Sequence, residues 1–391
     1  MRSIVFTGGG TGGHVYPALA VHAALSEDLR RRVLWIGSRK GVERTILRGS
    51  GIPYRAIPTG KLRRYLDLEN GRDIFRVGAG ILAALRVLRH VDAAIVFSKG
   101  GFVAVPVVVA AWILGIPVVI HESDSDPGLA TRLTAPMARR ICVPYSDTAR
   151  AFTPAQRRRI LVTGNPVRKE FFSAAPGDAL ARLGIRDEGQ PVLLVSGGSL
   201  GAQQLNDFVL EELAVLLDVC TLVHQTGPAG AAIIPEISRR AEQLTRAEAT
   251  RSGTPPARRY AAAPLWTEEF PPLLRRADLV VCRAGAGTIW ELAVTGTPAI
   301  LVPLSRGASR GDQIRNARRY ADTGAALVPP DSPADLAGAV RSLLLDRDRL
   351  RAMGVAARAF ADGDSAVTIA GVIAAIYNES DQGRKGESVR S

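Results

Sequence analysis

Apolar runs of strand length alternate with segments of helix length along most of the 391-residue chain. Strands that alternate with helices predict parallel sheets covered by helices on both faces. The pattern therefore predicts an α/β fold with two Rossmann-like doubly wound domains that face a cleft. The expected strands of the first domain are Ser3–Phe6, Val33–Ile36, Ala94–Phe97 and Val118–Ile120, and those of the second are Val192–Val195, Thr221–His224, Leu279–Cys282 and Ala299–Pro303.

The two groups of strands share their turn chemistry. A strand enters a glycine turn at TGGGTGGH (7–14) and again at SGGSLGAQ (196–203), and a helix stops before a strand at LGIP and again at TGTP. Similar turns could arise independently, but two similar domains explain more of the pattern. We expect an N-terminal domain over 1–165, a C-terminal domain over 166–365, a helix over 366–377 that returns to the first domain, and a disordered polar tail over 378–391.

One stretch of 18 residues, Val103–Ile120, carries no charge and is just long enough to span a membrane. However, Pro106, Gly115 and Pro117 interrupt it. We therefore favour a buried helix, a turn and a buried parallel strand over a membrane span.

Composition narrows the class of protein. A formal net charge of +13 indicates an anionic partner such as phosphate groups or a membrane surface, although charge also aids solubility. Nucleic acid is disfavoured, because aromatic residues make up only 5% and the sequence has no DNA- or RNA-binding motif. Cys142, Cys220 and Cys282 lack metal-binding spacing, so we expect reduced core thiols in a cytosolic protein. We expect no signal peptide, because glycine follows the N-terminus too soon to leave room for its apolar core.

The first glycine turn, TGGGTGGHVYP (7–17), fits the dinucleotide pattern G-x-G-x-x-G from Gly8 to Gly13. A dinucleotide site usually adds an acidic residue about 20 positions on, which binds the ribose. The next predicted strand instead ends in Gly-Ser-Arg at 37–39. NAD is therefore disfavoured, whereas Arg39 keeps NADP as a minor alternative.

Three glycine turns follow predicted strands, at Gly8–Gly13, Gly197–Gly201 and Gly285–Gly287. Such a turn presents backbone N–H groups to an anion, and the following helix adds about half a positive charge. Three of them indicate one ligand with several phosphates, or two phosphorylated ligands. His14 lies just beyond the first turn, where the helix dipole favours the neutral ring. It is either a general base or a residue that caps the helix or bonds a neighbour.

Other polar residues near the ends of predicted strands have two interpretations each. Glu291 could accept hydrogen bonds from ribose hydroxyls, or could compensate the dipole of its helix. Asp312 and Gln313 suit sugar hydroxyls, but they could equally begin an ordinary helix. In HESDSDPG (121–128), Asp124 and Asp126 could hold a divalent metal, as D-x-D does in some sugar transferases. We favour turn formation and no metal, because Pro-Gly follows directly.

A basic segment with interleaved apolar residues runs from Arg63 to Arg89. It could dock on an anionic leaflet, or it could form an amphipathic core helix whose arginines are solvated. The residues that we expect at a membrane are Arg72, Ile74, Phe75, Arg76, Leu82 and Arg86.

Several motifs occur in an order that resembles the MurG family of bacterial transferases. They are GGGTGGHVYPALA, GGFVAVP, HESDSDPGLA, TGNPVR, SGGSLGAQ, RAGAGTIWELAVTGTPAILVP and DQIRNA, and they cover roughly residues 3–375. The resemblance implies a GT-B fold and an inverting transfer of N-acetylglucosamine from UDP-GlcNAc, without a metal or a cofactor. The acceptor would be the C4 hydroxyl of undecaprenyl-diphospho-MurNAc-pentapeptide (lipid I), in peptidoglycan synthesis.

The resemblance also implies roles for single residues. Thr11, Gly12 and Gly13 would form a diphosphate loop near the acceptor, and His14 would be the base. The basic segment would dock a peripheral enzyme on the inner leaflet, at the cytoplasmic face of the cell membrane, where the lipid acceptor lies. The implied donor contacts are Arg168, Ser199, Thr267 near the uracil, Ala286, Gly287, Thr288, Ile289, Trp290 and Glu291 around the nucleotide, and Gln313 on the sugar.

Five positions, Phe102, Ser123, Asp124, Leu200 and Asp312, depart from the commonest pattern of this family. Asp124 replaces an asparagine that contacts the sugar or the acceptor, and Lys99 precedes the glycine pair before Phe102. We hypothesise that Lys99 and Asp124 compensate each other electrostatically. The changes leave the UDP half intact, so the alternative within the class is a related GT-B transferase with another glycolipid acceptor. The alternatives from other classes are a non-catalytic adaptor and a nucleotide-dependent oxidoreductase.

Overall fold

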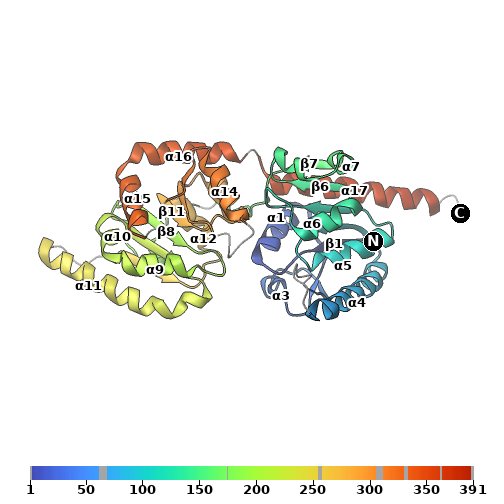
Figure 1. Cartoon of the computed structure of the whole chain (residues 1–391), viewed down its shortest axis with the longest axis horizontal. Helices are drawn as coiled ribbons and strands as arrows, with labels where there is room; N and C mark the ends of the chain where they lie inside the picture. The colour runs from blue at the N-terminus through green and yellow to red at the C-terminus, as the bar shows by residue number, and fades with distance from the viewer. Residues whose placement is uncertain are drawn as a thin grey trace. The chain divides into compact units, whose positions relative to one another are not determined.

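Figure 1 shows the computed structural model of the chain, which describes residues 2–60, 68–173, 175–253, 258–304, 311–329, 333–361 and 363–388. The chain folds into two compact units. Unit 1 contains Met1–Arg168 and Gly363–Ser391, and unit 2 contains Lys169–Asp362. The boundaries expected at 165 and 365 differ from these limits by a few residues. Each unit has its own parallel sheet and its own buried hydrophobic residues.

The sheet of unit 1 has the strand order β3-β2-β1-β4-β5-β6-β7, and every pairing between its described strands is parallel. After β3 the chain crosses to the other side of β1, which creates a switch point between β1 and β4. Doubly wound sheets bind ligands at such points. The strands are β1 (Ser3–Thr7), β2 (Val33–Ser38), β3 (Tyr54–Ile57), β4 (Ala93–Ser98), β5 (Val118–His121), β6 (Arg140–Val143) and β7 (Ile160–Val162).

Helices connect most of these strands. The uncharged stretch Val103–Ile120 forms helix α5 and strand β5 with a turn between them, as its prolines and glycine predicted. The helices of unit 1 are α1 (Tyr16–Ala24), α2 (Glu27–Arg30), α3 (Val42–Ile46), α4 (Leu68–His90), α5 (Ala104–Ile113), α6 (Leu129–Thr134), α7 (Pro154–Arg157) and α17 (Ser365–Ser388), with 3-10 turns η1 (Gly12–His14), η2 (Ala135–Met137) and η3 (Ser146–Ala151).

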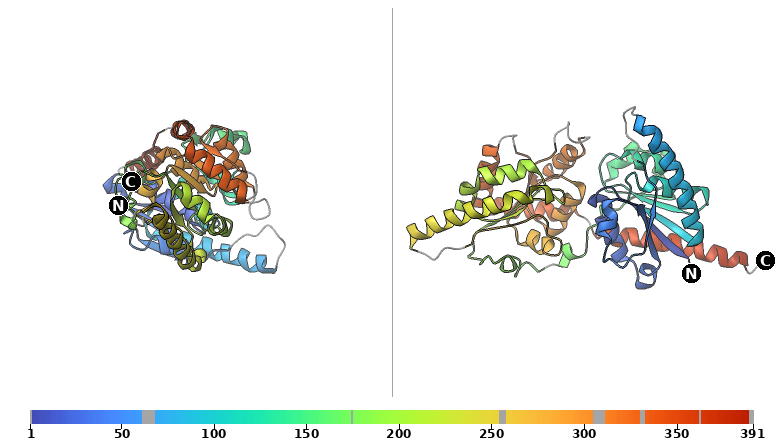
Figure 2. Two further views of the ribbon diagram at one scale, coloured as in Figure 1. Left: turned by 90° about the vertical axis from the view of Figure 1, so that its left-hand side faces the viewer. Right: turned by 90° about the horizontal axis from the view of Figure 1, so that it is seen from below.

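Alternate residues of the unit 1 sheet face two different cores, as the period of a strand requires. Ile4 and Phe6 pack in one core with residues of α1 and α17, whereas Val5 packs in the other with residues of α4 and α5. Figure 2 shows α4 and α17 on opposite sides of this sheet in its right-hand view. Burial on both faces explains why the central strands are continuous apolar runs in the sequence.

Helix α17 follows the whole of unit 2 in the sequence and yet packs in unit 1. Ile373 and Tyr377 are buried in the core that contains α1. Tyr377 Oη donates to Arg2 O at 3.2 Å and accepts from Arg32 Nη1 at 2.6 Å. The two ends of the chain therefore stabilise the same unit.

The same helix differs from one expectation from the sequence, and it belongs to a longer apolar segment. It continues past Asn378, where we expected a disordered tail, as far as Ser388. Within the described residues, one segment, Arg347–Gln382, is long and apolar enough to cross a membrane by length and composition. Core helices of soluble proteins pass the same test, and the apolar face of α17 is buried in unit 1. We therefore do not assign this segment to a membrane.

The sheet of unit 2 has the strand order β10-β9-β8-β11-β12-β13, again with parallel pairing throughout the described strands. Its switch point lies between β8 and β11. Each unit thus repeats the same plan of a doubly wound sheet. The strands are β8 (Val192–Ser196), β9 (Thr221–Gln225), β10 (Tyr260–Ala263), β11 (Leu279–Cys282), β12 (Ala299–Leu301) and β13 (Ala326–Leu327).

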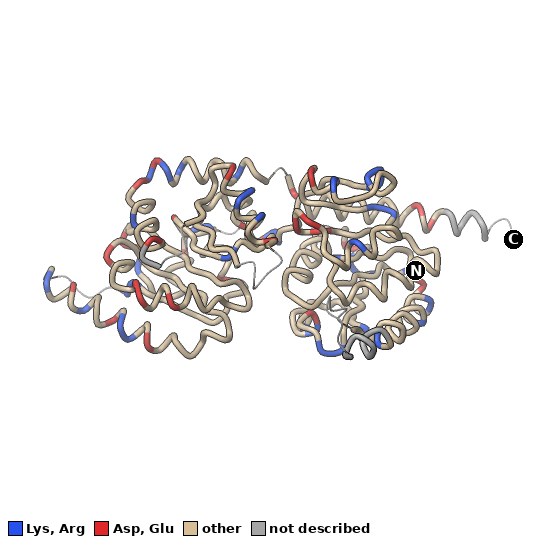
Figure 3. The backbone as a smooth tube through the Cα atoms, viewed as in Figure 1, with Lys and Arg blue, Asp and Glu red and all other residues tan. Residues whose placement is uncertain are grey.

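The longest helix of unit 2, α11, carries an apolar face to the core and a charged face to solvent. Acidic and basic residues follow one another along it in Figure 3. The helices of unit 2 are α8 (Glu170–Ser173), α9 (Gln203–Glu211), α10 (Leu213–Val219), α11 (Ile234–Ser252), α12 (Phe270–Arg276), α13 (Ala286–Thr295), α14 (Asp312–Ala321), α15 (Pro333–Leu345) and α16 (Arg347–Phe360), with 3-10 turns η4 (Ala181–Leu183) and η5 (Pro228–Ile233).

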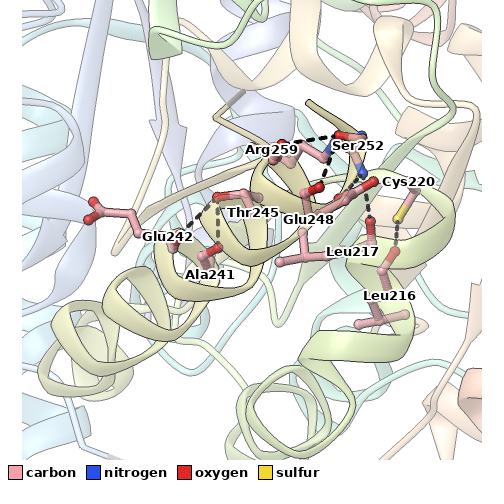
Figure 4. A network of polar contacts seen from close by, with 10 residues as sticks. Leu216, Leu217, Cys220, Ala241, Glu242, Thr245, Glu248, Ser252 and Arg259 are labelled. Atoms are coloured by element: carbon pink, nitrogen blue, oxygen red, sulfur yellow. Dashed lines mark hydrogen bonds and ion pairs between the residues drawn. The ribbon is translucent and has the colours of Figure 1, made fainter. Parts of the chain in front are cut away.

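Figure 4 shows the polar contacts that fasten α11 to the end of α10. Arg259 Nη1 donates to Glu248 Oε2 at 3.0 Å and to Leu217 O at 3.2 Å. Cys220 Sγ donates to Leu216 O at 3.1 Å. These contacts satisfy polar groups at the edge of the core, so we assign them a structural role.

All three cysteines are free and buried, in agreement with the expected reduced core thiols. Burial raises the pKa of each thiol, at Cys142, Cys220 and Cys282, to about 12. A thiol with such a pKa is not ionised near neutral pH and is a poor nucleophile.

Candidate functional site

The first glycine turn connects β1 to α1 at the switch point of unit 1. Gly8–Gly13 follow the last residue of β1, and η1 then places His14 just before α1. Helix α1 begins without a side-chain cap, so its end can present backbone N–H groups to an anion. His14 Nδ1 lies 3.0 Å from Thr11 Oγ1, and the ring is half-buried. The turn itself therefore holds the histidine.

The loop after β4 packs directly on this first turn. Gly101 has a φ of +78°, and a Cβ atom there would lie 2.4 Å from Gly9 O and 3.5 Å from His14 Nδ1. A Cβ atom on Gly10 would lie 2.8 Å from the ring of Phe102. Glycine is required for two backbones to approach this closely. The two loops together fix the position of His14 beside the end of β4.

Glu122 organises the loop after β5. Its Oε1 accepts from the N–H groups of Ser123 at 2.8 Å and Asp124 at 3.1 Å, and its Oε2 accepts from Gly128 N–H at 3.0 Å. Asp124 is half-buried in this turn. Among the residues that the structure describes, no group of three His, Cys, Asp or Glu side chains could hold a metal ion. The D-x-D pair lies in a turn that hydrogen bonds to Glu122 stabilise.

Lys99 is almost completely buried beside this loop, at the end of β4. Its Nζ donates to Ser123 Oγ, which in turn donates to Asn165 Oδ1 at 3.1 Å. Burial lowers the pKa of Lys99 to about 8, while attraction to Glu122 and, to a smaller extent, Asp124 opposes the shift. The hypothesised compensation by Asp124 is therefore present but secondary. The direct partner is Ser123, and Glu122 contributes the larger attraction.

The second glycine turn connects β8 to α9 at the switch point of unit 2. Ser199 is exposed at its tip. Gln225, buried at the end of β9, supports the turn, because its Nε2 donates to Ser196 Oγ at 3.1 Å. Gln225 Oε1 accepts from Trp266 N–H at 3.0 Å and so places the exposed Thr267 near the end of β9. Sequence patterns did not single out Gln225, although a polar residue that ends a buried strand is a usable signal.

The third glycine turn begins α13, which carries the predicted nucleotide residues Ala286–Glu291. Gly285 occupies the N-cap position, and no side chain caps the helix. Ile289 and Trp290 are buried, and the Trp290 ring lies 5.4 Å from that of Phe360. The side chains of Ile289 and Trp290 thus hold the helix in the core. The half-buried positions of this first stretch are Ala286, Gly287, Thr288 and Glu291.

Arg283 links the third turn to its neighbours, a role that its sequence context did not reveal. Its Nη1 donates to Gln204 Oε1 at 3.0 Å and to Val302 O at 2.9 Å. Burial lowers the pKa of this guanidinium, but arginine stays charged in proteins. Arg283 therefore brings together the start of α9 and the ends of β11 and β12.

Gln313 lies in the first turn of α14, as the sequence predicted for a polar helix start. Its Oε1 accepts from Leu304 N–H at 3.1 Å, in the segment after β12. Asn316 Nδ2 donates to Ala284 O at 3.4 Å, which ties the same helix to the end of β11. Because its oxygen is engaged, Gln313 would use its NH₂ group as a donor to a sugar hydroxyl.

Arg168 is the last residue of unit 1. Its guanidinium lies over the ring of Tyr16, 5.3 Å from the centroid. The structure thus groups Arg168 with the first glycine turn and α1. Its contact with the donor stays a prediction.

Helix α4 contains most of the described part of the expected membrane segment. Phe75 and Leu82 are 80% and 57% exposed, and Arg76 and Arg86 are exposed too. Residues 61–67 and the side chains of Arg72 and Ile74 lie outside the described part of the chain. The exposed apolar side chains argue against the alternative in which this face of the helix belongs to the core.

Helix α5, which packs against α4, adds two more exposed apolar residues. Trp112 is 61% and Ile113 is 52% exposed at its last turn. The prediction of a buried helix did not reveal them, because apolar content alone does not show which end of a helix reaches solvent.

Comparison with known proteins identifies the class. Residues 4–143 match the glycosyltransferase family 28 N-terminal domain and residues 192–368 match its C-terminal domain. The crystal structure of Acinetobacter baumannii MurG, 27% identical, aligns with a TM-score of 0.67 over 95% of this chain and 99% of that one. A putative UDP-N-acetylglucosamine 2-epimerase from Listeria monocytogenes, 17% identical, aligns at 0.65 over 97% and 98% of the two chains, which shows a shared fold alone. The chain is a glycosyltransferase of the GT-B fold.

A curated relative narrows the class to one family. The protein from Treponema denticola is 40% identical over 398 residues, which cover 98% of this chain and 100% of the relative. That relative is named UDP-N-acetylglucosamine--N-acetylmuramyl-(pentapeptide) pyrophosphoryl-undecaprenol N-acetylglucosamine transferase. The chain belongs to this family of transferases, the MurG family.

Proposed function

We propose that this protein transfers N-acetylglucosamine from UDP-GlcNAc to the C4 hydroxyl of undecaprenyl-diphospho-MurNAc-pentapeptide, with inversion at the sugar, in peptidoglycan synthesis. The observation that carries the proposal is the presence of glycine turns at the switch points of two separate units. A transferase of this kind must bind two phosphorylated substrates, and each turn offers backbone N–H groups to a diphosphate.

In this proposal unit 2 binds the donor. The uncapped N-termini of α9 and α13 face the diphosphate, and Glu291 accepts from the ribose hydroxyls. Ser199 and Thr267 are exposed and can contact the phosphates and the uracil, respectively. Gln313 donates to the sugar. Arg283 and Gln225 position the loops, because their hydrogen bonds connect the segments that would surround the nucleotide.

Unit 1 binds the acceptor, and His14 is the general base. Its Nδ1 carries the proton and donates to Thr11 Oγ1, so that Nε2 accepts the proton of the attacking C4 hydroxyl. Thr11, Gly12 and Gly13 hold the acceptor diphosphate. The contact to Thr11 helps to orient the ring toward the hydroxyl.

The same proposal places the enzyme on the cytoplasmic face of the cell membrane as a peripheral protein. Helix α4 offers Phe75 and Leu82 to the lipid, with Arg76 and Arg86 beside them for anionic headgroups. Trp112 and Ile113 of α5 extend the apolar surface. Docking of this kind would bring the acceptor half to the leaflet that carries the lipid-linked substrate.

Asp124 supports a second candidate acceptor within the same class. A carboxylate replaces the commoner amide at this position, and it lies in the loop that Glu122 and Lys99 organise. A related glycolipid with a different hydrogen-bonding pattern is the alternative acceptor.

A transfer assay tests the proposal. The protein is incubated with UDP-GlcNAc and a lipid I analogue, with and without EDTA, and the disaccharide product is measured by mass spectrometry. We expect product in both cases, because the proposed chemistry uses backbone dipoles in place of a metal. Donor hydrolysis without transfer would favour another acceptor, and loss of product in EDTA would revive the metal role of Asp124 and Asp126.

A further inference from the structure

Glu43 is a fully buried acidic residue of α3 that bonds to the first glycine turn. Its Oε2 accepts from Gly10 N–H at 3.1 Å. Its Oε1 accepts from Ser38 N–H at 2.9 Å and from Ser38 Oγ at 2.5 Å. One carboxylate thus connects the turn that carries His14 to the end of β2.

The carboxylate also fills the space between these two segments. A Cβ atom on Gly9 would lie 2.5 Å from Glu43 Cδ, and one on Gly41 would lie 2.1 Å from Glu43 Oε1. Contacts this short cannot form, so both glycines leave room for the acid. The turn and the carboxylate therefore have matched shapes.

The location of Glu43 revises one expectation from the sequence. Dinucleotide-binding sheets have an acidic residue at the end of the second strand, where it binds a ribose. In this protein an acid does reach the end of β2, but it comes from α3 and accepts its hydrogen bonds from the protein. A ribose hydroxyl would have to compete with Gly10 and Ser38 for this carboxylate, which disfavours a nucleotide in unit 1.

We propose that Glu43 is a positioning residue for transfer, which fixes the first glycine turn and thereby the place of His14 and of the acceptor diphosphate. The inference rests on the proposed function, in which His14 is the base. Gly10 precedes His14 in the same turn, and a free Gly10 N–H would let the turn move toward the solvent. Misplacement of a reacting group by about 1 Å can cost about 100-fold in rate.

The environment of Ser38 supports a rigid connection. Tyr54 Oη, from the neighbouring strand β3, donates to Ser38 O at 2.6 Å. Burial and, second, the nearby charge of Glu43 raise the pKa of Tyr54, so the phenol stays protonated and continues to donate. The segment that receives Glu43 is thus itself held by the sheet.

Two variants test this role by different routes. In Glu43→Gln the side chain keeps its size, but its new NH₂ group must face the N–H of Gly10 or of Ser38, which are donors as well. In Gly41→Ala the new methyl group pushes against Oε1 from outside the turn. Gly371→Ala is the control, because a Cβ atom at this exposed position of α17 meets nothing within 4 Å.

Four measurements are made on each protein. Steady-state transfer gives kcat and the KM for each substrate, and calorimetry gives the Kd for UDP. Hydrogen–deuterium exchange of the peptide over residues 8–14 reports on the turn without any need for activity. Circular dichroism checks that each variant is folded.

We expect Glu43→Gln and Gly41→Ala to lower kcat by about 10- to 100-fold, to speed exchange over 8–14, and to leave the Kd for UDP unchanged. Gly371→Ala should match the wild type throughout. Wild-type kcat, or unchanged exchange, in a folded Glu43→Gln protein would overturn the inference, as would a Gly41→Ala protein that behaves like the control. If the wild type transfers nothing, the proposed function fails, and the exchange data still decide whether Glu43 holds the turn.

Discussion

At the scale of single residues, buried polar side chains hold the glycine turns in place. Glu43 accepts from the first glycine turn of unit 1, and Gln225 and the half-buried Arg283 bond to residues beside the turns of unit 2. Glu122 does the same for the loop after β5. The turns themselves could be predicted, because glycine spacing after an apolar run is a strong local signal. Their supports could not, because the sequence does not show which acids and amides become buried.

His224 is another buried polar residue, and its hydrogen bonds fix its protonation. Asn206 Nδ2 donates to Thr226 O at 3.2 Å, so Asn206 Oδ1 accepts from His224 Nε2 at 3.0 Å. The hydroxyl of Tyr260 then donates to His224 Nδ1, at 3.2 Å. The bond at Nδ1 requires the neutral ring, whereas Nε2 can donate in either protonation state, and burial lowers the pKa of His224 to about 4.

Unit 2 should therefore lose stability in mild acid. The ordinary pKa of 6.5 applies to the unfolded chain, which takes up a proton before the folded protein does as the pH falls from 6.5 toward 4. The loss from this group approaches about 3 kcal/mol at the acid end of that window, and the group adds no pH dependence above it. Urea unfolding of the wild type and of His224→Gln at pH 7 and pH 4.5 measures the effect. Equal losses in the two proteins would contradict this account.

At the scale of elements, the central strands were predictable. The missed strands, β3, β6, β7, β10 and β13, lie at or next to the edges of the two sheets. All eight expected strands exist, because burial on both faces makes them continuous apolar runs. The missed strands are short. Two residues of β3 are exposed, β13 has two residues, and β10 is rich in alanine, which has a low β propensity. The local hydrophobic pattern is therefore enough to predict the central strands of each sheet. The outer strands form only because they pair with a neighbouring strand, which the local pattern does not show.

The close packing of the first two loops of unit 1 predicts a difference between two glycine substitutions. Gly101 and Gly115 both have positive φ, +78° and +68°, so alanine costs roughly 1–2 kcal/mol of backbone strain at either site. A methyl group on Gly101 also meets Gly9 O at 2.4 Å, whereas one on Gly115 meets nothing within 4 Å.

We expect Gly101→Ala to destabilise the protein more than Gly115→Ala and to reduce transfer, while Gly115→Ala keeps wild-type kcat. Thermal unfolding and the transfer assay measure the two effects. Similar stability and activity in the two variants would show that the loops do not need this close approach.

At the scale of the whole molecule, the sequence predicted two similar α/β domains, and the chain forms two units of the same sheet plan. The turns indicated two similar domains because each unit repeats the same pattern of glycine turns. The core of unit 1 also depends on α1 and α17, from opposite ends of the chain. Hydrophobic periodicity shows that such helices have an apolar face but not which unit they cover.

The proposed membrane docking would involve the whole enzyme, and it predicts the effect of polar substitutions on α4 and α5. Burial of one large apolar side chain contributes about 1.5–3 kcal/mol, so Leu82→Gln or Trp112→Ser should each weaken binding to anionic vesicles by about tenfold or more. Val367→Ser is the control, since Val367 is 56% exposed on α17. Vesicle co-sedimentation measures binding, and UDP affinity should not change. Wild-type binding by both variants would show that this surface does not dock on the membrane.

The central claim is a division of labour, in which unit 1 supplies the base and unit 2 binds the donor. Turnover and UDP affinity of a His14→Ala protein, with His90→Gln as the control at an exposed histidine, test it most directly. The account predicts that His14→Ala lowers transfer by about 10²- to 10⁴-fold and leaves the Kd for UDP at the wild-type value. Transfer at the wild-type rate, or loss of UDP binding together with transfer, would contradict it.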